Sequence, residues 1–412
     1  MRHWVTIASS GIIAAAVALC AAPAWSKPKE KPAPAAKVAK TEKAKRARSP
    51  LAGLDLTRIR IGKDGVTAPA ARGRIAHLSL DPDLQKTAMR LLERYRIPDA
   101  AIVLMEVETG RTLVWASRVE EGPRRDLCVD ATAPAASVFK VITGSALVEE
   151  AGLGPRTKQC YSGGRSRITA TDLIDNPNRD KWCASLSEAM GRSINTVFAR
   201  LAINHLTPKS LTSAAKAYGF DEEIPFDVPV AKSKVKIPED ELGFGRTAAG
   251  FWNTTLSPLA GATIMSTIAN DGEMVRPYIV ESVTEKGKTI YEAKAGRKVL
   301  RKVVSPETAR ALTTMLEATV SSGTSRKAFR DSKGRPFLPN IRVAGKTGTL
   351  TDHKKQRLYT WFVGFAPSRE PEVAISVLAA NRPIWTAKAN TVARDVLRAY
   401  FAKKGARGVR KP

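Results

Sequence analysis

Histidine and cysteine are scarce in this chain of 412 residues, which has only four of each. No C-x-x-C pair occurs and the histidines are scattered, so the ligand spacing of a transition-metal site is absent. A Ser-His-Asp hydrolase is disfavoured as well, because no histidine lies in a recognisable triad context and G-x-S-x-G is missing. We therefore expect a function that needs neither a metal nor another cofactor.

Acidic residues are also few, with 39 Asp and Glu against 67 Lys and Arg and a formal net charge of +28. Residues 26–50 carry +7, residues 402–412 carry +5 and Arg2 carries +1, which leaves +15 for residues 51–401. The positive excess therefore lies partly in two end segments and partly in the body. The hydrophobic share of 43% and the charged share of 26% exclude wholesale disorder, collagen and a polytopic membrane protein.

The two ends of the chain differ in composition from the rest. Residues 4–26 hold no charged side chain and end near Ala22-Pro23-Ala24, an A-x-A pattern typical of a cleaved export signal. We predict a signal peptide over 1–24, a basic Lys/Pro/Ala-rich tether over 25–76 and a basic tail over 402–412. The protein is expected to be exported to the periplasm or cell envelope, with an uncleaved membrane anchor as the alternative.

Export also decides how the positive charge is interpreted. A strongly basic chain favours polyanionic partners. Outside the cytoplasm these are membrane surfaces and cell-envelope polymers, so we expect no nucleic-acid partner.

Two of the cysteines bracket a polar segment. Cys160 and Cys183 flank a stretch rich in Gly, Asn, Asp and Arg, which buries little and would be stabilised by a cross-link in an oxidising compartment. We predict a disulfide between them. The alternative is that the three cysteines left after removal of the signal peptide, which include Cys128, are all buried thiols. Cys128 stays unpaired in either case.

The body of the chain alternates helical and extended patterns. Helical periodicity predicts helices over residues 80–97, 135–150, 185–202, 258–269, 305–321 and 387–401. Apolar runs predict strands over residues 101–107, 111–117, 341–349, 359–366 and 373–380. Short connections between the strands indicate an α+β, three-layer fold in which an antiparallel sheet of about five strands is flanked by helices. We assign this domain to residues 77–401.

Ser137-Val138-Phe139-Lys140 stands at the start of a predicted helix. Positions i and i+3 share one helix face, so the hydroxyl and the amine lie one turn apart. A lysine whose pKa is lowered by burial and by neighbouring cations can take the proton of a serine hydroxyl and make it a nucleophile. The helix N-terminus adds free N–H groups where an oxyanion would form. Alone, S-x-x-K also occurs by chance as a capping serine with an exposed lysine.

Two further motifs follow along the chain. Ser193-Ile194-Asn195 lies in a helix-rich segment, where a hydroxyl and an amide could pass a proton and hold a substrate amide. Lys346-Thr347-Gly348-Thr349 lies on a predicted strand. There the two threonine hydroxyls could bind a carboxylate beside a fixed positive charge, and Gly348 could allow a substrate backbone to approach the strand.

In this order and spacing, the three motifs resemble the S-x-x-K, S-x-N and K-T-G signature of penicillin-binding D,D-peptidases and serine β-lactamases. Longer segments resemble transpeptidase domains of penicillin-binding proteins, among them PAASVFKVITGSALVEEAGL, LSPLAGATIMSTIANDGEMVRPYIV and TWFVGFAPSREPEVAISVLAANRP. The resemblance covers roughly residues 77–401. It implies a DD-peptidase/β-lactamase-like fold and an enzyme that acts on D-Ala-D-Ala stem peptides of peptidoglycan, with β-lactams as inhibitors.

The resemblance also implies roles for the site residues. Ser137 would form an acyl-enzyme with Lys140 as general base, and Ser193 and Lys346 would carry the proton to the departing D-Ala. Binding would fall to Asn195 for the substrate amide and to Thr347 and Thr349 for the terminal carboxylate. The acyl group would then pass to an amine of a neighbouring stem peptide, as in a transpeptidase, or to water, as in a carboxypeptidase.

Two alternatives stay open at this point. Phe139 beside Lys140 resembles the S-x-F-K of class D β-lactamases, which favours a β-lactamase or β-lactam sensor. Those enzymes usually have an aliphatic residue where this chain has Asn195. A non-catalytic wall-binding protein with a degenerate peptidase fold would also suit the positive charge. The presence of all four polar groups that the chemistry needs, on Ser137, Lys140, Ser193 and Lys346, argues against it.

Overall fold

The computed structural model of the chain describes residues 49–164, 167–294, 296–354 and 356–409. The predicted signal peptide and the first half of the predicted tether lie outside these residues. Within the described ranges, no helix combines the length and the apolar character that crossing a membrane requires.

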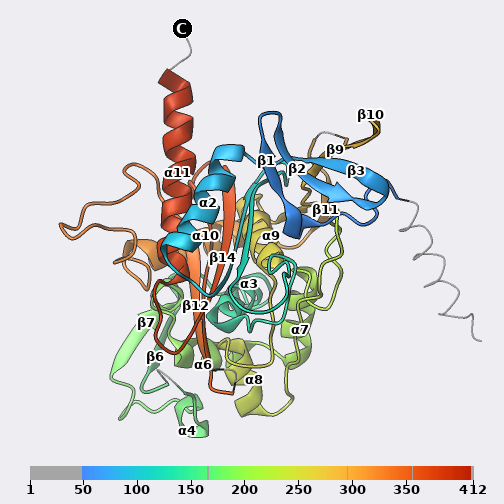
Figure 1. Cartoon of the computed structure of the whole chain (residues 1–412). Helices are drawn as coiled ribbons and strands as arrows, with labels where there is room; N and C mark the ends of the chain where they lie inside the picture. The colour runs from blue at the N-terminus through green and yellow to red at the C-terminus, as the bar shows by residue number, and fades with distance from the viewer. Residues whose placement is uncertain (1–48, 165–166, 295, 355, 410–412) are drawn as a thin grey trace, which may run out of the picture. The chain divides into compact units, whose positions relative to one another are not determined.

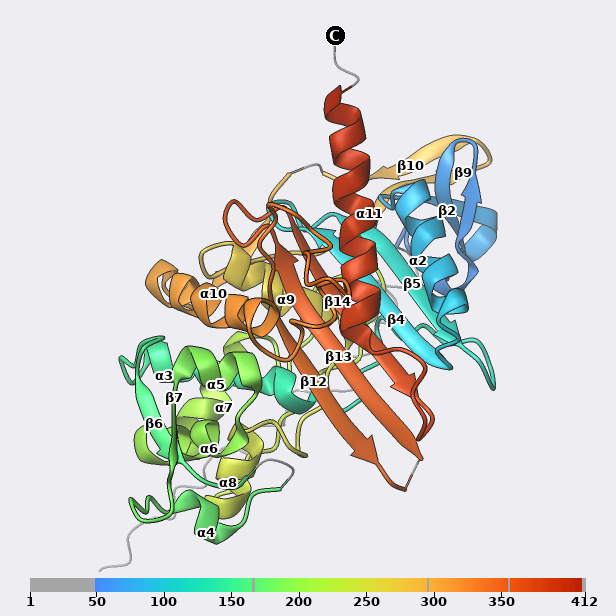
Figure 2. The same cartoon turned by 90° about the vertical axis from the view of Figure 1, so that its left-hand side faces the viewer.

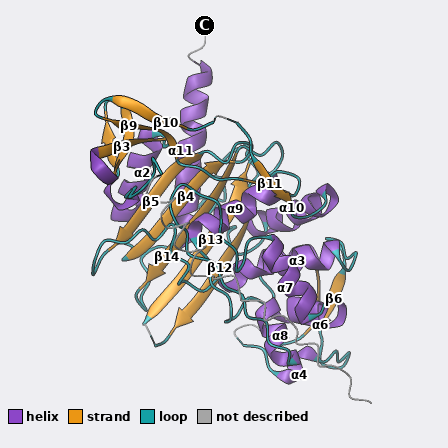
Figure 3. Cartoon of the chain, turned by 90° about the vertical axis from the view of Figure 1, so that its right-hand side faces the viewer, coloured by secondary structure: helices purple, strands orange, loops and turns teal. Residues whose placement is uncertain are grey.

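Five strands form one antiparallel sheet in the order β12-β13-β14-β4-β5 (Figures 2 and 3). They are β4 (Asp99–Glu106), β5 (Thr112–Val119), β12 (Ala344–Asp352), β13 (Arg357–Ala366) and β14 (Val373–Asn381). This confirms the predicted fold class. The strand expected over 341–349 starts three residues later, because residues 341–343 lie in the loop that leads into β12.

Helices cover both faces of this sheet. Alternate side chains of a strand point to opposite faces. On β4, Ile102 and Leu104 join an apolar cluster with α2 (Pro82–Arg94) and α11 (Ala389–Val409), whereas Ala101 and Val103 join a second cluster with α9 (Pro258–Ala269). Burial on both sides explains why the central strands read as continuous apolar runs.

The remaining helices lie mostly beside the β12 edge of the sheet (Figure 1). They are α3 (Lys140–Glu149), α4 (Ala170–Leu173), α5 (Leu186–Arg192), α6 (Asn195–His205), α7 (Pro208–Ala217), α8 (Glu241–Ala248) and α10 (Pro306–Ser321). Two predicted helices are interrupted. The one over 135–150 begins as the 3-10 helix η3 (Ala136–Phe139), and the one over 185–202 breaks at Ser193, whose φ of 58° is left-handed and ends α5.

A second sheet begins before the predicted domain boundary at residue 77 and is completed by two strands from later in the chain. Its order is β1-β2-β3-β9-β10, from β1 (Arg60–Gly62), β2 (Gly65–Ala70), β3 (Arg74–Leu78), β9 (Val280–Glu285) and β10 (Lys288–Glu292), with the 3-10 helices η1 (Leu56–Arg58) and η2 (Ala71–Gly73) beside it. Val66, Ala68 and Ala76 are buried there. The predicted tether over 25–76 therefore does not extend to residue 76, and the folded part begins before residue 77. Three short strands within a basic stretch gave too little apolar periodicity to be recognised.

Two strand pairs complete the fold: β8 (Glu273–Val275) with β11 (Val299–Lys302), and β6 (Lys158–Tyr161) with β7 (Trp182–Ser185). The C-terminal helix also exceeds its prediction, because α11 continues past residue 401 into the predicted basic tail. Lys403 Nζ lies 2.6 Å from Asp81 Oδ1, and Asp81 caps the N-terminus of α2. Part of the tail's positive charge is thus bound to the folded body.

Candidate active site

Ser137 lies on η3, which is held against the five-stranded sheet. The indole N–H of Trp361 on β13 donates to the Pro134 carbonyl at 2.9 Å, and the Ala135 N–H donates to the Thr254 carbonyl at 3.1 Å. Ala136 has a φ of 51°, a conformation that non-glycine residues rarely adopt. The serine that follows is partly exposed, whereas its neighbours Ala136 and Val138 are buried.

Lys140, one turn after Ser137, is fully buried. Its Nζ atom lies 3.0 Å from Ser137 Oγ and 2.7 Å from Asn195 Oδ1, and it also contacts the Ala249 carbonyl. Burial, followed by the positive charge of Lys346, holds the pKa of Lys140 well below its ordinary value. This shift favours the neutral lysine amine at pH values at which an exposed lysine is charged.

A neutral amine at this place has one lone pair directed at the serine. It carries two hydrogens, and two of its three partners, the Asn195 amide oxygen and the Ala249 carbonyl, can only accept. Those two partners take both hydrogens. The Ser137 hydroxyl then donates to the nitrogen lone pair, which is the arrangement that a general base needs before proton transfer.

Lys346 and Ser193 form a second serine–lysine pair. Lys346 Nζ lies 3.0 Å from Ser193 Oγ and donates to the Thr347 carbonyl at 2.8 Å. Burial lowers the pKa of Lys346 to about 7. Two buried lysines with lowered pKa values thus stand in one site, each beside a serine hydroxyl.

The lowered pKa of Lys346 predicts a pH-dependent effect on stability. Lysine in an unfolded chain stays protonated up to about pH 10.4, so between pH 7 and that value the unfolded state binds the extra proton. The titration of Lys346 therefore makes the free energy of unfolding rise with pH over this range. We expect the free energy of unfolding of Lys346→Met, relative to that of the parent, to be most favourable below pH 7. This difference should shrink by about 1.4 kcal/mol per pH unit toward pH 10.

Urea unfolding of both proteins from pH 6 to pH 10 measures this difference. Lys354→Met is the matched control, because Lys354 is exposed on the turn between β12 and β13. Its free energy of unfolding should follow the parent at every pH. A pH-independent difference between Lys346→Met and the parent would show that Lys346 titrates as an ordinary lysine.

The K-T-G-T segment lies on β12, the edge strand of the sheet beside η3. Thr347 is half-buried and Thr349 is exposed. Gly348 is buried between them, and a Cβ there would lie 3.2 Å from the Ala135 carbonyl oxygen and 3.3 Å from Ala136 Cβ. The Cβ side of Gly348 thus faces Ala135 and Ala136, so this glycine lets the turn that carries Ser137 lie close to the strand. The predicted approach of a substrate backbone to Gly348 stays a prediction.

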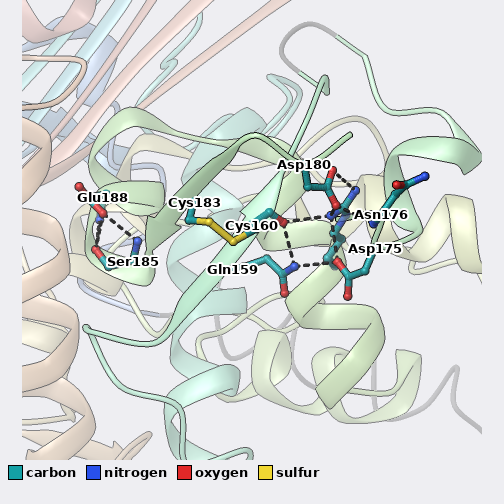
Figure 4. Close-up of a disulfide and its surroundings, with 9 residues drawn as sticks. Gln159, Cys160, Asp175, Asn176, Asp180, Cys183, Ser185 and Glu188 are labelled. Carbon is teal, nitrogen blue, oxygen red and sulfur yellow. Dashed lines mark hydrogen bonds and ion pairs between the residues drawn. A yellow bond between two sulfur atoms is a disulfide. The ribbon is translucent and has the colours of Figure 1, made fainter. Parts of the chain in front are cut away.

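The segment between Cys160 and Cys183 also reaches the site. The structure joins these cysteines in a disulfide across β6 and β7 (Figure 4). Within the closed segment, the Gly164 carbonyl accepts from Asn195 Nδ2 at 3.1 Å, which orients the amide so that its oxygen faces Lys140. In the sequence this segment shows no role beyond the disulfide, because a main-chain carbonyl leaves no signal there.

A buried arginine fastens the same segment to α6. The Arg200 side chain has no exposed surface and donates to Asp180 Oδ2 at 2.6 Å, to Asp175 Oδ1 at 2.9 Å and to the Cys160 carbonyl at 3.0 Å. These hydrogen bonds hold the pKa of Asp180 well below its ordinary value. Asn195 and Arg200 lie on one helix, so the cross-linked segment and the site are braced by a common element.

The sequence predicted eight residues that the structure gathers in one region. Ser137, Lys140 and Asn195 form one hydrogen-bonded group, and Ser193, Lys346 and Thr347 form another. Gly348 joins β12 to η3, and Thr349 follows it on the strand. Within the described ranges, no cluster of His, Cys, Asp and Glu could hold a metal ion.

A family model supplies the decisive comparison. Residues 100–401 match the model described as "Penicillin binding protein transpeptidase domain". The chain belongs to the penicillin-binding protein transpeptidase family. This confirms the resemblance inferred from the three motifs.

Relatives of this penicillin-binding protein domain cover most of its length. The "Peptidoglycan D,D-transpeptidase PbpA" of Mycobacterium tuberculosis is 28% identical over 354 residues, which span 77% of this chain and 70% of that protein. The protein of the same name from Mycolicibacterium smegmatis is 32% identical over 270 residues, 63% of this chain and 52% of that protein.

Solved penicillin-binding protein structures share the fold. The crystal structure of the M. tuberculosis protein PBPA superimposes with a TM-score of 0.65 at 27% identity, over 80% of this chain and 81% of that one. Its penicillin G acyl-enzyme complex gives a TM-score of 0.61 at 26% identity, over 79% and 80% of the two chains. A D,D-transpeptidase domain from Eggerthella lenta gives 0.67 at 21% identity, over 84% and 95%.

Proposed function

We propose that this protein is a penicillin-binding acyl-serine D,D-transpeptidase that acts on D-Ala-D-Ala stem peptides in peptidoglycan synthesis. The observation that carries the proposal is the 3.0 Å contact between the Ser137 hydroxyl and the buried amine of Lys140, whose other two partners can only accept hydrogen bonds. Membership of the transpeptidase family and the acyl-enzyme complexes of the M. tuberculosis relative support it.

Acylation begins with the proton of Ser137. As Oγ attacks the carbonyl carbon of the penultimate D-Ala, the proton moves to the lone pair of Lys140. The negative charge that develops on the carbonyl oxygen is stabilised by the main-chain N–H groups of Ser137 and Thr349. The C–N bond then breaks, and the departing D-Ala amine takes a proton relayed through Ser193 and Lys346. An ester on Ser137 and a free D-Ala are the products.

Substrate binding uses the remaining polar groups. The Asn195 side chain binds the substrate amide, and Thr347 and Thr349 bind the terminal carboxylate beside the Lys346 charge. In the second step, an amine of a neighbouring stem peptide attacks the ester and gives a cross-link, whereas water gives a carboxypeptidase product. A β-lactam enters as a mimic of D-Ala-D-Ala and stays on Ser137 as the acyl-enzyme.

The place of action follows from the same proposal. Peptidoglycan lies outside the cytoplasm, so the predicted signal peptide over 1–24 would deliver the domain to the periplasm or cell envelope. The basic segment that follows it would act as a tether, shorter than first predicted. The positive charge of the body, +15 over residues 51–401, would face anionic stem peptides and envelope polymers.

The test is the product formed from peptidoglycan. Purified protein is incubated with uncross-linked peptidoglycan, which is then digested and separated by mass. We expect cross-linked dimers with release of D-Ala, and neither product with Ser137→Ala. Release of D-Ala without dimers would assign a carboxypeptidase, and rapid turnover of a chromogenic cephalosporin would assign a β-lactamase. Absence of all three would contradict the proposed enzyme.

A further inference from the structure

The turn after α10 is wedged between two elements of the site. The Thr324 N–H donates to the Gly191 carbonyl at 3.0 Å, at the C-terminal end of α5 just before Ser193. A Cβ on Gly323 would lie 2.1 Å from the Gly191 carbonyl oxygen, so a glycine is needed for this contact. Since α10 also packs against β12, the end of this helix lies between α5, which ends at Ser193, and β12, which carries Lys346.

The side chain of Thr324 faces the K-T-G-T strand. Its Oγ1 atom lies 2.6 Å from Thr347 Oγ1. Thr324 is exposed and Thr347 is half-buried, so solvent or a ligand can reach the pair. The main-chain carbonyl of Thr347 accepts from Lys346 Nζ at 2.8 Å, so the same residue also contacts the Lys346 amine.

The hydroxyls of Thr324 and Thr347 leave one hydrogen for a ligand. Two hydroxyls carry two hydrogens, and their mutual hydrogen bond uses one. The second remains for an outside acceptor. When Thr324 donates to Thr347, the Thr347 oxygen is polarised and its own hydrogen becomes a stronger donor. A carboxylate is an acceptor without hydrogens of its own, and the positive charge of Lys346 favours it further.

We propose that Thr324 is a positioning residue for the terminal carboxylate of the substrate, acting through the hydroxyl of Thr347. The inference rests on the proposed function and adds to it a residue that lies outside all three motifs. In the sequence, Thr324 follows the glycine that ends a helix, so its pattern indicates a helix end and nothing more.

The experiment compares two reactions that differ only in the carboxylate. Second-order acylation rate constants are measured for penicillin G and for its methyl ester, with the parent, Thr324→Val and Thr324→Ser. Valine keeps the shape and removes the hydroxyl, whereas serine keeps the hydroxyl. We expect Thr324→Val to slow acylation by penicillin G about 3- to 10-fold, the factor of one ordinary hydrogen bond. The rate of acylation by the methyl ester should stay unchanged. Thr324→Ser should restore the rate with penicillin G.

Thr314→Val is the matched control, because Thr314 is an exposed threonine on α10, the helix before this turn, and its hydroxyl donates to the Arg310 carbonyl. It should leave both rates unchanged. Equal slowing of acid and ester by Thr324→Val would mean that the turn merely holds the site together, and it would overturn the inference. An unchanged penicillin G rate would do the same. If the unsubstituted protein reacts with neither compound, the proposed function itself fails.

Discussion

Ser137→Ala is expected to abolish covalent labelling of the protein by a fluorescent penicillin. The substitution removes the hydroxyl that would become the ester oxygen, and no bond to the drug can form without it. Labelling is measured by gel fluorescence after denaturation, and mass spectrometry of digested parent protein should place the adduct on the peptide that contains Ser137.

Ser193→Ala is the informative control, because Ser193 also lies 3.0 Å from a buried lysine amine. If Ser137 is the nucleophile, Ser193→Ala slows labelling but leaves an adduct on Ser137. The reverse outcome, with labelling lost in Ser193→Ala and kept in Ser137→Ala, would assign the nucleophile to the second serine–lysine pair. Equal melting temperatures of the variants would confirm that both are folded.

Lys140→Ala is expected to slow acylation by at least about 100-fold, the usual effect of losing a general base. The parent's acylation rate should rise with pH as Lys140 loses its proton, and this rise should occur well below the pH at which an ordinary lysine titrates. In the variant that dependence should disappear. Stopped-flow acylation by a chromogenic cephalosporin between pH 5 and pH 10 measures both effects.

Lys140→Arg separates the loss of the base from the loss of a cation. Arginine places a positive group at the site but stays protonated, so it cannot take the serine proton. We expect it to be as slow as Lys140→Ala. Recovery of the rate with arginine would show that the site needs charge at this position and that another group accepts the proton.

The contact between the two residues of the first motif could be predicted because it combines side-chain chemistry with short local spacing. Ser137 and Lys140 are three residues apart, and a helical turn of either kind brings them together, so the replacement of an α-helix by η3 did not matter. The five-stranded sheet could be predicted for a similar reason. Its strands are buried on both faces, and their apolar runs are long enough to be distinguished from helices.

Features that depend on main-chain atoms or on distant pairing could not be predicted. β3 pairs with β9 across more than 200 residues, and its own five residues carry only a weak pattern. The left-handed backbone at Ser193, which ends α5, belongs to a residue that is not a glycine, so the residue type did not indicate this conformation. The contact between Gly164 and Asn195, like the one between Thr324 and Thr347, joins residues that are distant in sequence and carry no shared motif.

The contact between Gly191 and Gly323 bears on how resistance to β-lactams could arise. Here two helices meet through main-chain atoms, and a Cβ on either residue would collide with its partner segment. We expect a substitution at either glycine to push α5 away from α10 and so to disturb the contact between Ser193 and Lys346, on which the proposed reaction depends for stem peptides and for β-lactams alike. We therefore expect no resistance substitutions at this contact. Changes that distinguish antibiotic from substrate have to occur in side chains that border the site, where one ligand can be disfavoured without altering the spacing of the catalytic groups.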